Sequence, residues 1–258
     1  MSELLRIENL SIDIQGADSR KSLIKGLNLS VDDLQTVALV GGSGGGKTTV
    51  GLAILQLLAP AMKISEGNIF FSGKNLFECS QKQMQEIRGN DISMVFQEPL
   101  SAFNPVFRIG SQIAEVLQIH TDLNRKQIKN RVLELLDLSE VSDPKRVASY
   151  YPHQLSGGLR QRAMIAQAIA ANPKLVIADE PTSNLDVTIQ ARILALFKKI
   201  RKELNISMLL ITHDLGVVKF LADRVFILNE GRVIESGATN TIFENPKESF
   251  TKKLMELI

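Results

Sequence analysis

The sequence has only one cysteine and almost no net charge. The single cysteine, Cys79, excludes an internal disulfide framework and favours a reducing compartment. The 30 basic residues nearly balance the 28 acidic ones, which leaves a net charge of +2. A surface that coats nucleic acid would need a larger positive excess, although a local basic patch stays compatible with these numbers. We therefore expect no nucleic acid among the partners of this protein.

Long hydrophobic runs are missing as well. No stretch of the sequence approaches the roughly 20 apolar residues that a membrane-spanning helix needs. The most apolar segment, residues 50–64, is interrupted by Pro60, and we expect it to form a buried helix. We expect the helix itself to cover residues 48–58 and Pro60 to help end it. The first nine residues carry charges and no long apolar stretch, so we expect no signal peptide. Any role at a membrane would therefore depend on a partner protein.

The most informative stretch of the sequence is residues 37–49, VALVGGSGGGKTT. Its residues 41–48 fit the phosphate-loop pattern GxxxxGK[ST], between a short apolar strand and the start of a helix. Glycines allow a tight turn in which several backbone N–H groups point into one hollow. The pattern predicts that Lys47 reaches the β- and γ-phosphates of a nucleotide and that the Thr48 hydroxyl ligates Mg²⁺. A flexible glycine linker is the alternative, and it leaves the flanking strand and helix without an explanation.

An acidic pair follows another predicted strand. Residues 175–179, LVIAD, form a short apolar run that ends in Asp179, and Glu180 comes next. A buried strand that brings a carboxylate to its end can hold Mg²⁺, and the adjacent Glu180 would be free to orient or deprotonate a water. An isolated acidic pair can also be a solvated strand end. The phosphate loop in the same chain favours the metal-binding interpretation.

Gln97 and His213 stand at the ends of two further predicted strands, residues 92–96 and residues 208–212. Ligands of α/β proteins bind at the carboxyl ends of parallel strands. A glutamine at that place could touch a metal-bound nucleotide, and a histidine there lies on the ligand-binding edge. Taken alone, each residue would be an ordinary surface or core residue.

A second helix start that is suited to an anion occurs within residues 151–162, YPHQLSGGLRQR. Ser156 is a natural N-cap, and Gly157 and Gly158 leave the backbone accessible at the start of a helix. A Ser-Gly-Gly turn before a helix is common and usually structural. Between residues 99 and 151 the apolar residues recur at helical spacing, which predicts a helical insertion into the α/β core. Asn124 can cap one of these helices.

The first part of the chain predicts a different kind of structure. Residues 5–31 alternate short apolar stretches with turn residues and predict antiparallel strands joined by a loop at residues 18–21. Strands of this kind often carry an aromatic residue that stacks on adenine, but only Ile12 and Ile14 stand near that position. We expect both to be ordinary core residues, and any contact to a base to be aliphatic. Residues 66–76, EGNIFFSGKNL, predict another strand pair with turns at Gly67 and Gly73.

The whole set of motifs resembles the ATP-binding cassette family over essentially the whole chain. The motifs that carry this resemblance are, in order, GGSGGGKT, Gln97, LSGGLRQR, LVIADEPTSNLD and THD. Longer stretches are similar to the branch that energises import of oligopeptides, dipeptides and nickel: MVFQEPLSAFNP, YPHQLSGGLRQRAMIAQAIA, DEPTSNLDVTIQARIL and ITHDLGVV. The sequence departs from the family at Asn184, where alanine is frequent, at Gly42, where many relatives carry glutamate, and at residues 34–35, where Leu-Gln replaces the usual Gly-Glu.

The resemblance implies an α/β fold with a P-loop NTPase (RecA-like) core, an N-terminal antiparallel β subdomain and an inserted helical subdomain. A single cassette domain would cover residues 1–258. Its catalytic core and antiparallel part would comprise residues 1–97 and 163–258, and the helical subdomain would comprise residues 98–162.

The resemblance also implies a role for each matching residue, with ATP and Mg²⁺ as cofactors. The implied catalytic residues are Glu180, which would act on the attacking water, His213, which would hold the γ-phosphate, and Lys47. The implied Mg²⁺ ligands are Thr48, Gln97 and Asp179. The residues implied to contact ATP, some of them on the ATP of a second chain, are Gly41, Gly42, Ser43, Gly44, Gly45, Gly46, Lys47, Thr48, Thr49, Gln97, Ser156, Gly157, Gly158 and Asp186.

The implied partners are a second ATPase subunit, identical or homologous, two transmembrane permease subunits and, indirectly, an extracytoplasmic solute-binding protein. The protein would then lie at the cytoplasmic face of the membrane. One alternative is a soluble cassette ATPase of DNA repair or translation, which would usually join two cassettes or insert long coiled coils. Another is a GTPase or small-molecule kinase, but the sequence has no NKxD motif and LSGGLRQR would have no role. The transported solute stays open among peptides, nickel or nickel chelates, and related small solutes.

Overall fold

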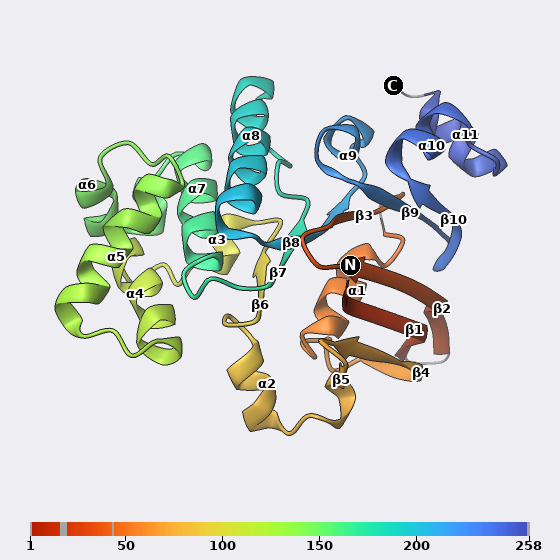
Figure 1. Cartoon of the computed structure of the whole chain (residues 1–258), viewed down its shortest axis with the longest axis horizontal. Coiled ribbons are helices and arrows are strands. Elements are labelled where there is room, and N and C mark those ends of the chain that lie inside the picture. The colour runs from red at the N-terminus through yellow and green to blue at the C-terminus, as the bar shows by residue number, and fades with distance from the viewer. Residues whose placement is uncertain (1, 16–19, 43, 257–258) are drawn as a thin grey trace. The chain divides into compact units, whose positions relative to one another are not determined.

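The computed structural model describes residues 2–15, 20–42 and 44–256 (Figure 1). The chain divides into two compact units, of which the first contains residues 1–84 and 207–258 and the second residues 85–206. Ser43, which the resemblance assigns to the ATP site, lies outside the described residues. No helix in the described part of the chain is both long enough and apolar enough to cross a lipid bilayer.

An antiparallel sheet forms one layer of the first unit, and Figure 1 shows its long strands side by side. Its strands, in the order β2-β1-β4-β5, are β1 (Glu3–Gln15), β2 (Arg20–Asp32), β4 (Met62–Phe71) and β5 (Lys74–Asn75). The predicted antiparallel strands are confirmed, but residues 20–21 belong to β2 rather than to the loop. Ile12 is buried in this sheet, as expected of a core residue.

The turn predicted at Gly67 is wrong, because this residue lies inside β4. Its φ angle is 93°, and a Cβ atom at this position would come within 2.4 Å of the carbonyl oxygen of Glu8 in the neighbouring strand. The pairing of β1 with β4 shifts register between Glu8 and Ser11. Glycine is therefore needed here for a close approach of two backbones at an irregularity.

The second sheet of the first unit contains the strand that precedes the phosphate loop. Its strands in this unit, in the order β10-β9-β3-β8, are β3 (Thr36–Gly41), β8 (Ser207–Thr212), β9 (Arg224–Asn229) and β10 (Arg232–Ala238). Strand β3 pairs in parallel with β8 and with β9, while β10 is antiparallel to β9. Every residue of β3 and β8 is buried, which explains why both read as continuous apolar runs.

Short helices accompany the sheets of the first unit: α1 (Lys47–Ile54), the 3₁₀ turn η1 (Leu76–Glu78), α9 (Leu215–Leu221), α10 (Thr239–Glu244) and α11 (Ser249–Met255). The boundary between the two units, after residue 84, falls within helix α2 (Gln81–Ile87). The expected helix at residues 48–58 is too long by one turn. Gln56 adopts a left-handed conformation with φ 52°, and its side chain donates to the carbonyl of Leu76. This conformation ends α1 earlier than the apolar pattern indicates.

The second unit combines two parallel strands with a group of helices. Its strands are β6 (Ile92–Val95) and β7 (Leu175–Asp179). Its helical elements are α3 (Pro99–Ala102), α4 (Ile109–His120), α5 (Arg125–Leu138), α6 (Pro144–Ser149), the 3₁₀ turn η2 (Pro152–Gln154), α7 (Gly157–Ala168) and α8 (Val187–Leu204). Asn124 caps α5 by accepting the N–H groups of Lys126 and Gln127, as its position suggests. The predicted helical segment, residues 98–162, lies within this unit.

The C-terminal helix α11 is attached to β10 through the carboxylate of Glu235. Its Oε1 accepts the N–H of Lys247 at 2.8 Å, and its Oε2 accepts the N–H of Glu248 at 3.1 Å. Burial raises the pKa of this carboxyl, but the neighbouring Thr251 hydroxyl, the two backbone N–H groups and the charge of Lys247 outweigh it, so the pKa is lowered. The ionised form therefore stabilises this junction.

Replacing this residue in the variant Glu235→Gln is expected to lower the free energy of unfolding by about 1–2 kcal/mol at neutral pH, because charge-assisted hydrogen bonds are lost. The pKa of Glu235 is lower in the folded than in the unfolded chain, so the wild type loses this contribution as the pH falls from the ordinary glutamate pKa through the lowered folded value. Urea unfolding at neutral and acid pH measures both proteins. A difference that stays constant into the acid range would contradict the assignment.

Candidate functional site

The phosphate-loop sequence forms the junction between β3 and α1 in the first unit. Strand β3 ends at Gly41, residues 44–46 form a turn, and α1 begins at Lys47. Gly46 is the N-cap of α1 with φ 90°, which glycine adopts without strain. A Cβ atom on Gly41 would lie 2.3 Å from the carbonyl oxygen of Leu228. The glycines at both ends of the loop are thus required by the backbone itself.

Lys47 is held against the loop that it follows. Its side chain is buried, and Nζ donates to the carbonyl oxygens of Gly41 at 2.9 Å and Gly42 at 3.0 Å. The positive charge therefore lies at the bend, close to the first turn of α1. Thr48 in that turn is exposed, whereas Thr49 is buried. The positive end of a helix and a lysine ammonium at one place form an arrangement that suits a polyphosphate.

His213 lies at the same sheet edge as the phosphate loop. In the parallel pair β3–β8, Val40 stands opposite Thr212, so His213 follows β8 where Gly41 follows Val40. The N–H of the next residue, Asp214, donates to Thr212 Oγ1 at 3.0 Å, which fixes the backbone after the strand. His213 is exposed at this edge. The structure thus brings the predicted histidine and the predicted loop to one end of the first unit's parallel strands.

The second unit places the acidic pair and Gln97 at one edge in the same way. Strands β6 and β7 are parallel, with Val95 opposite Ala178, so Asp179 and Gln97 follow at the carboxyl end of the pair. Asp179 is 2% exposed, whereas Gln97 is exposed. Glu180 directly follows the strand with φ 45° and begins a tight turn.

Each of the three predicted metal ligands offers an oxygen of the kind that Mg²⁺ binds. Thr48 offers a hydroxyl oxygen, Gln97 an amide oxygen and Asp179 a carboxylate. Mg²⁺ prefers oxygen ligands, keeps several waters and is usually bound through one or two protein groups together with substrate phosphates. A buried carboxylate at a strand end and an exposed hydroxyl beside a phosphate loop fit this mode of binding.

The start of α7 is built as the sequence predicts. Ser156 is the N-cap of this 12-residue helix, and its Oγ accepts the N–H of Leu159 at 3.4 Å. Ser156 and Gly157 are exposed. Gly158 is buried, and a Cβ atom there would lie 3.1 Å from the side chain of Ile189. The helix start therefore presents open backbone on one side and packs tightly on the other.

Two residues that the sequence did not single out tie this helix and the neighbouring loops together. Gln161 is buried, and its Nε2 donates to the carbonyl of Pro181 at 2.7 Å, directly after the acidic pair. Glu98 accepts a hydrogen bond from Asn184 at 3.1 Å. Gln161 stands one helical turn after Gly157, a spacing that could have indicated a residue near the same face. Asp186 is exposed and caps α8 by accepting the N–H of Ile189 at 2.9 Å.

Comparisons with known proteins agree with one another. A family model described as ABC transporter matches residues 24–183. The chain is 43% identical over 256 residues to the oligopeptide transport ATP-binding protein OppD of Bacillus subtilis (strain 168), covering 99% of this chain and 72% of that protein. It is 42% identical over 256 residues to the dipeptide transport ATP-binding protein DppD of the same organism, covering 99% of this chain and 76% of that protein.

Solved structures share the fold. A dimeric, post-hydrolysis state of the ATP-binding cassette MJ0796 bound to ADP and Pi has a TM-score of 0.82 and 27% identity, covering 92% of this chain and 99% of that one. The structure of cbiO1 from Clostridium perfringens, part of the ABC transporter complex cbiONQ, has a TM-score of 0.79 and 28% identity, covering 95% of this chain and 92% of that one.

Proposed function

The chain belongs to the ABC transporter family and is an ATPase of that family, and we propose that it energises the import of peptides across a membrane. The observation that carries the ATP-dependent part of this proposal is the strand–loop–helix at residues 36–54. In it, the buried ammonium of Lys47 donates to the carbonyl oxygens of Gly41 and Gly42 in the glycine loop. The similar proteins OppD and DppD are named for oligopeptide and dipeptide transport, which favours peptides over nickel. The same names favour transport over DNA repair or translation.

In the proposed reaction, residues at or after the ends of strands β3, β6, β7 and β8 bind the phosphates, the metal or the attacking water. The loop N–H groups and Lys47 bind the β- and γ-phosphates, and His213 holds the γ-phosphate. Glu180 orients the attacking water and accepts its proton. Thr48, Gln97 and Asp179 would hold Mg²⁺, which would supply positive charge beside the phosphate oxygens. Because phosphoryl transfer needs little covalent help, fixed positive charge and positioning supply most of the rate enhancement.

The exposed start of α7 supports a site that is shared between two chains. Ser156, Gly157 and Gly158 would bind the γ-phosphate of ATP held by a second ATPase subunit, and Asp186 would contact that subunit nearby. The helix is 12 residues long, so its N-terminus adds a partial positive charge. The similar cassette MJ0796 is dimeric with ADP and Pi. ATP would hold two such faces together, and loss of the γ-phosphate would let them separate.

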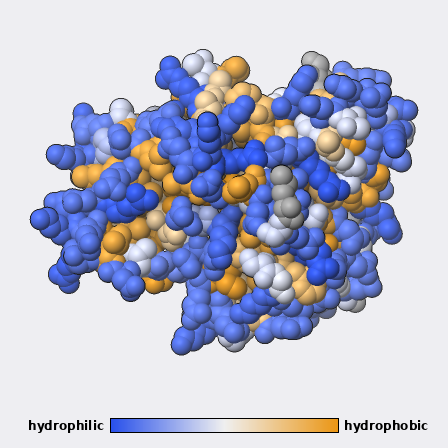
Figure 2. Space-filling view, in the orientation of Figure 1, coloured by the Kyte–Doolittle hydropathy of each residue, from blue (hydrophilic) through white to orange (hydrophobic). Residues whose placement is uncertain are grey.

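An exposed apolar segment after Gln97 is the proposed contact to a permease subunit. Leu100, Val106 and Phe107 are 48%, 70% and 53% exposed. On the face shown in Figure 2, apolar surface also interrupts the hydrophilic surface over the helices of this unit. Contiguous apolar exposure marks interaction sites in proteins of this size. The protein would thus lie at the cytoplasmic face of the membrane through its permease subunits.

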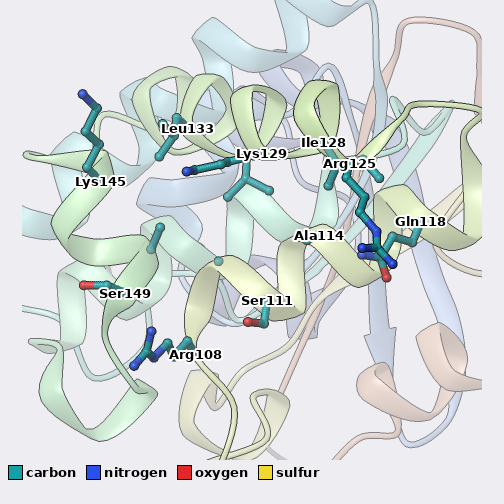
Figure 3. Close-up of a pocket in the computed structure, with 13 residues that line it drawn as sticks. Arg108, Ser111, Ala114, Gln118, Arg125, Ile128, Lys129, Leu133, Lys145 and Ser149 are labelled. Carbon is teal, nitrogen blue, oxygen red and sulfur yellow. The ribbon is translucent and has the colours of Figure 1, made fainter.

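A groove of about 810 Å³ lies between α4, α5 and α6 of the same unit (Figure 3). Apolar residues such as Ala114, Ile128 and Leu133 form part of its lining. The charged residues of the lining are all basic: Arg108, Arg125, Lys129 and Lys145. An apolar floor with a cationic rim fits an acidic amphipathic helix, so we expect a permease helix with acidic residues to bind here.

Reversing one charge in the groove tests this contact. The variant Lys129→Glu is expected to weaken binding of the permease at least tenfold, since like charges across an interface cost on the order of several kcal/mol. Lys126 is exposed on the same helix but does not line the groove, so Lys126→Glu is the matched control. Co-purification with permease subunits in detergent measures binding, and ATP hydrolysis by the isolated chain should not change. Equal recovery of the permease with Lys129→Glu would contradict the assignment.

Reconstitution tests the function as a whole. The chain, its permease subunits and the solute-binding protein are placed in lipid vesicles with a labelled peptide. Uptake that requires both ATP and Mg²⁺ is the expected result. Hydrolysis that proceeds equally well with and without permease and peptide, and no co-purifying membrane protein, would exclude transport.

A further inference from the structure

One hydrogen bond in the second unit joins two loops that have different tasks in the proposed function. The side-chain amide of Asn184 donates from Nδ2 to Oε1 of Glu98 at 3.1 Å. Asn184 lies in the turn that follows Glu180, and Glu98 directly follows Gln97. The bond therefore connects the segment of the water-activating carboxylate with the segment of a magnesium ligand, over a sequence separation of 86 residues.

Glu98 is placed so that its carboxylate can make this contact. It is the N-cap of α3, and its backbone carbonyl accepts the N–H groups of Ser101 at 3.1 Å and Ala102 at 3.2 Å. Its side chain makes no capping hydrogen bond. The short side chains of aspartate, serine or asparagine would cap the helix at this position. The longer glutamate side chain extends to Asn184 instead, while its backbone stays attached to α3.

Asn184 is equally well placed on the other side. Its φ angle is 61°, in the left-handed region that asparagine tolerates better than most residues. The turn before it is fixed to Glu180, whose carbonyl oxygen accepts the N–H of Ser183 at 3.1 Å and its hydroxyl at 2.9 Å. Gln161 binds the carbonyl of Pro181 in the same turn. Asn184 thus follows a turn that begins at Glu180 and is held by three hydrogen bonds.

We propose that Asn184 is a positioning residue that acts through Glu98 and sets the place of Gln97 relative to Glu180. This inference rests on the proposed function, in which Gln97 binds Mg²⁺ and Glu180 acts on the water. Both side chains are exposed, so the bond adds little to stability and its effect is geometric.

Variants of the two partners separate geometry from stability. Asn184→Gly keeps the left-handed conformation and removes the amide. Asn184→Asp places two carboxylates opposite each other. In the double variant Asn184→Asp/Glu98→Gln, carboxylate and amide exchange places, so the hydrogen bond returns with the opposite donor. Asn205→Asp is the matched control, because Asn205 has φ 53° and is exposed at the end of α8.

Two measurements report on the hydrogen bond between Asn184 and Glu98. Hydrogen–deuterium exchange reports on the N–H groups of Ser101 and Ala102 in the chain without nucleotide, and the Mg²⁺ concentration for half-maximal ATP hydrolysis reports on Gln97. In Asn184→Asp and Asn184→Gly, both the exchange rate and this Mg²⁺ concentration are expected to rise about threefold or more, as coupling between neighbouring groups allows. The double variant is expected to return both to the wild-type value, and Asn205→Asp to leave both unchanged.

The outcomes distinguish this inference from the proposed function. Unchanged exchange and Mg²⁺ dependence in both single variants, or a double variant as impaired as Asn184→Asp, would overturn the role of Asn184. If the wild type still hydrolyses ATP in a Glu180-dependent way, the proposed function stands in that case. A wild type that hydrolyses no ATP would overturn the proposed function itself.

Discussion

The variant Glu180→Gln is expected to lower ATP hydrolysis by about 10²–10⁴-fold, because a positioned general base contributes roughly this factor. Glutamine has nearly the same shape as glutamate but cannot accept the proton of the attacking water. The turn after Glu180 is fixed by Ser183 and by Gln161, so the new side chain will occupy the same place. ATP binding is expected to persist, because Lys47 and the glycine loop are unchanged.

Two measurements on Glu180→Gln check this expectation: the rate of phosphate release at saturating ATP and Mg²⁺, and equilibrium binding of ATP. Glu203 is exposed in α8, so Glu203→Gln is a control that removes the same charge away from the strand end. Turnover of Glu180→Gln at the wild-type rate would remove Glu180 from the reaction. A loss of binding equal to the loss of turnover would make it a binding residue instead.

The variant Lys47→Met is expected to weaken ATP binding by about 10²-fold or more, because losing one partner of a buried charged contact costs on the order of 2–5 kcal/mol. Methionine retains the length and the apolar stem of the lysine side chain. Its sulfur cannot donate to the carbonyls of Gly41 and Gly42, which Nζ contacts at 2.9 and 3.0 Å. Without the Lys47 ammonium, no lysine charge at the loop would offset the negative charge of the phosphates.

Equilibrium dialysis with labelled ATP measures the affinity of Lys47→Met. Lys74 is exposed in β5 and gives the control Lys74→Met, which removes the same charge from the same unit. A thermal melt of Lys47→Met shows whether the loop still folds. Wild-type affinity in a folded Lys47→Met protein would contradict the assignment of this loop to the phosphates.

The sequence predicted those parts of the fold whose cause is local. Strands β3, β7 and β8 are buried throughout and read as uninterrupted apolar runs. The caps at Asn124 and Ser156 are confirmed, since a capping side chain bonds to N–H groups two or three residues away. The end of α1 and the place of Gly67 were predicted wrongly because both depend on contacts to other elements, Leu76 and Glu8.

In the candidate site, too, features with a local cause could be predicted from the sequence, and contacts between distant residues could not. Parallel pairing explains why Asp179 and Gln97 share one edge and why His213 and the phosphate loop share another, so the predicted strand ends, together with the phosphate loop, pointed to these positions. The hydrogen bond between Asn184 and Glu98 joins residues 86 positions apart through exposed side chains. No spacing or periodicity marks such a pair. Asn184 was noticeable only as a departure from the family pattern.

Mixing two inactive variants tests most directly whether each ATP is hydrolysed between two chains. Glu180→Gln damages one side of the site, and Ser156→Arg blocks the exposed helix start on the other side. A mixed dimer would contain one site with neither substitution. If half of the dimers are mixed, about a quarter of the wild-type turnover should return when the two purified variants are combined, as two-fold symmetry requires. A mixture no more active than its separate components, or a Ser156→Arg protein that is fully active alone, would contradict the shared site.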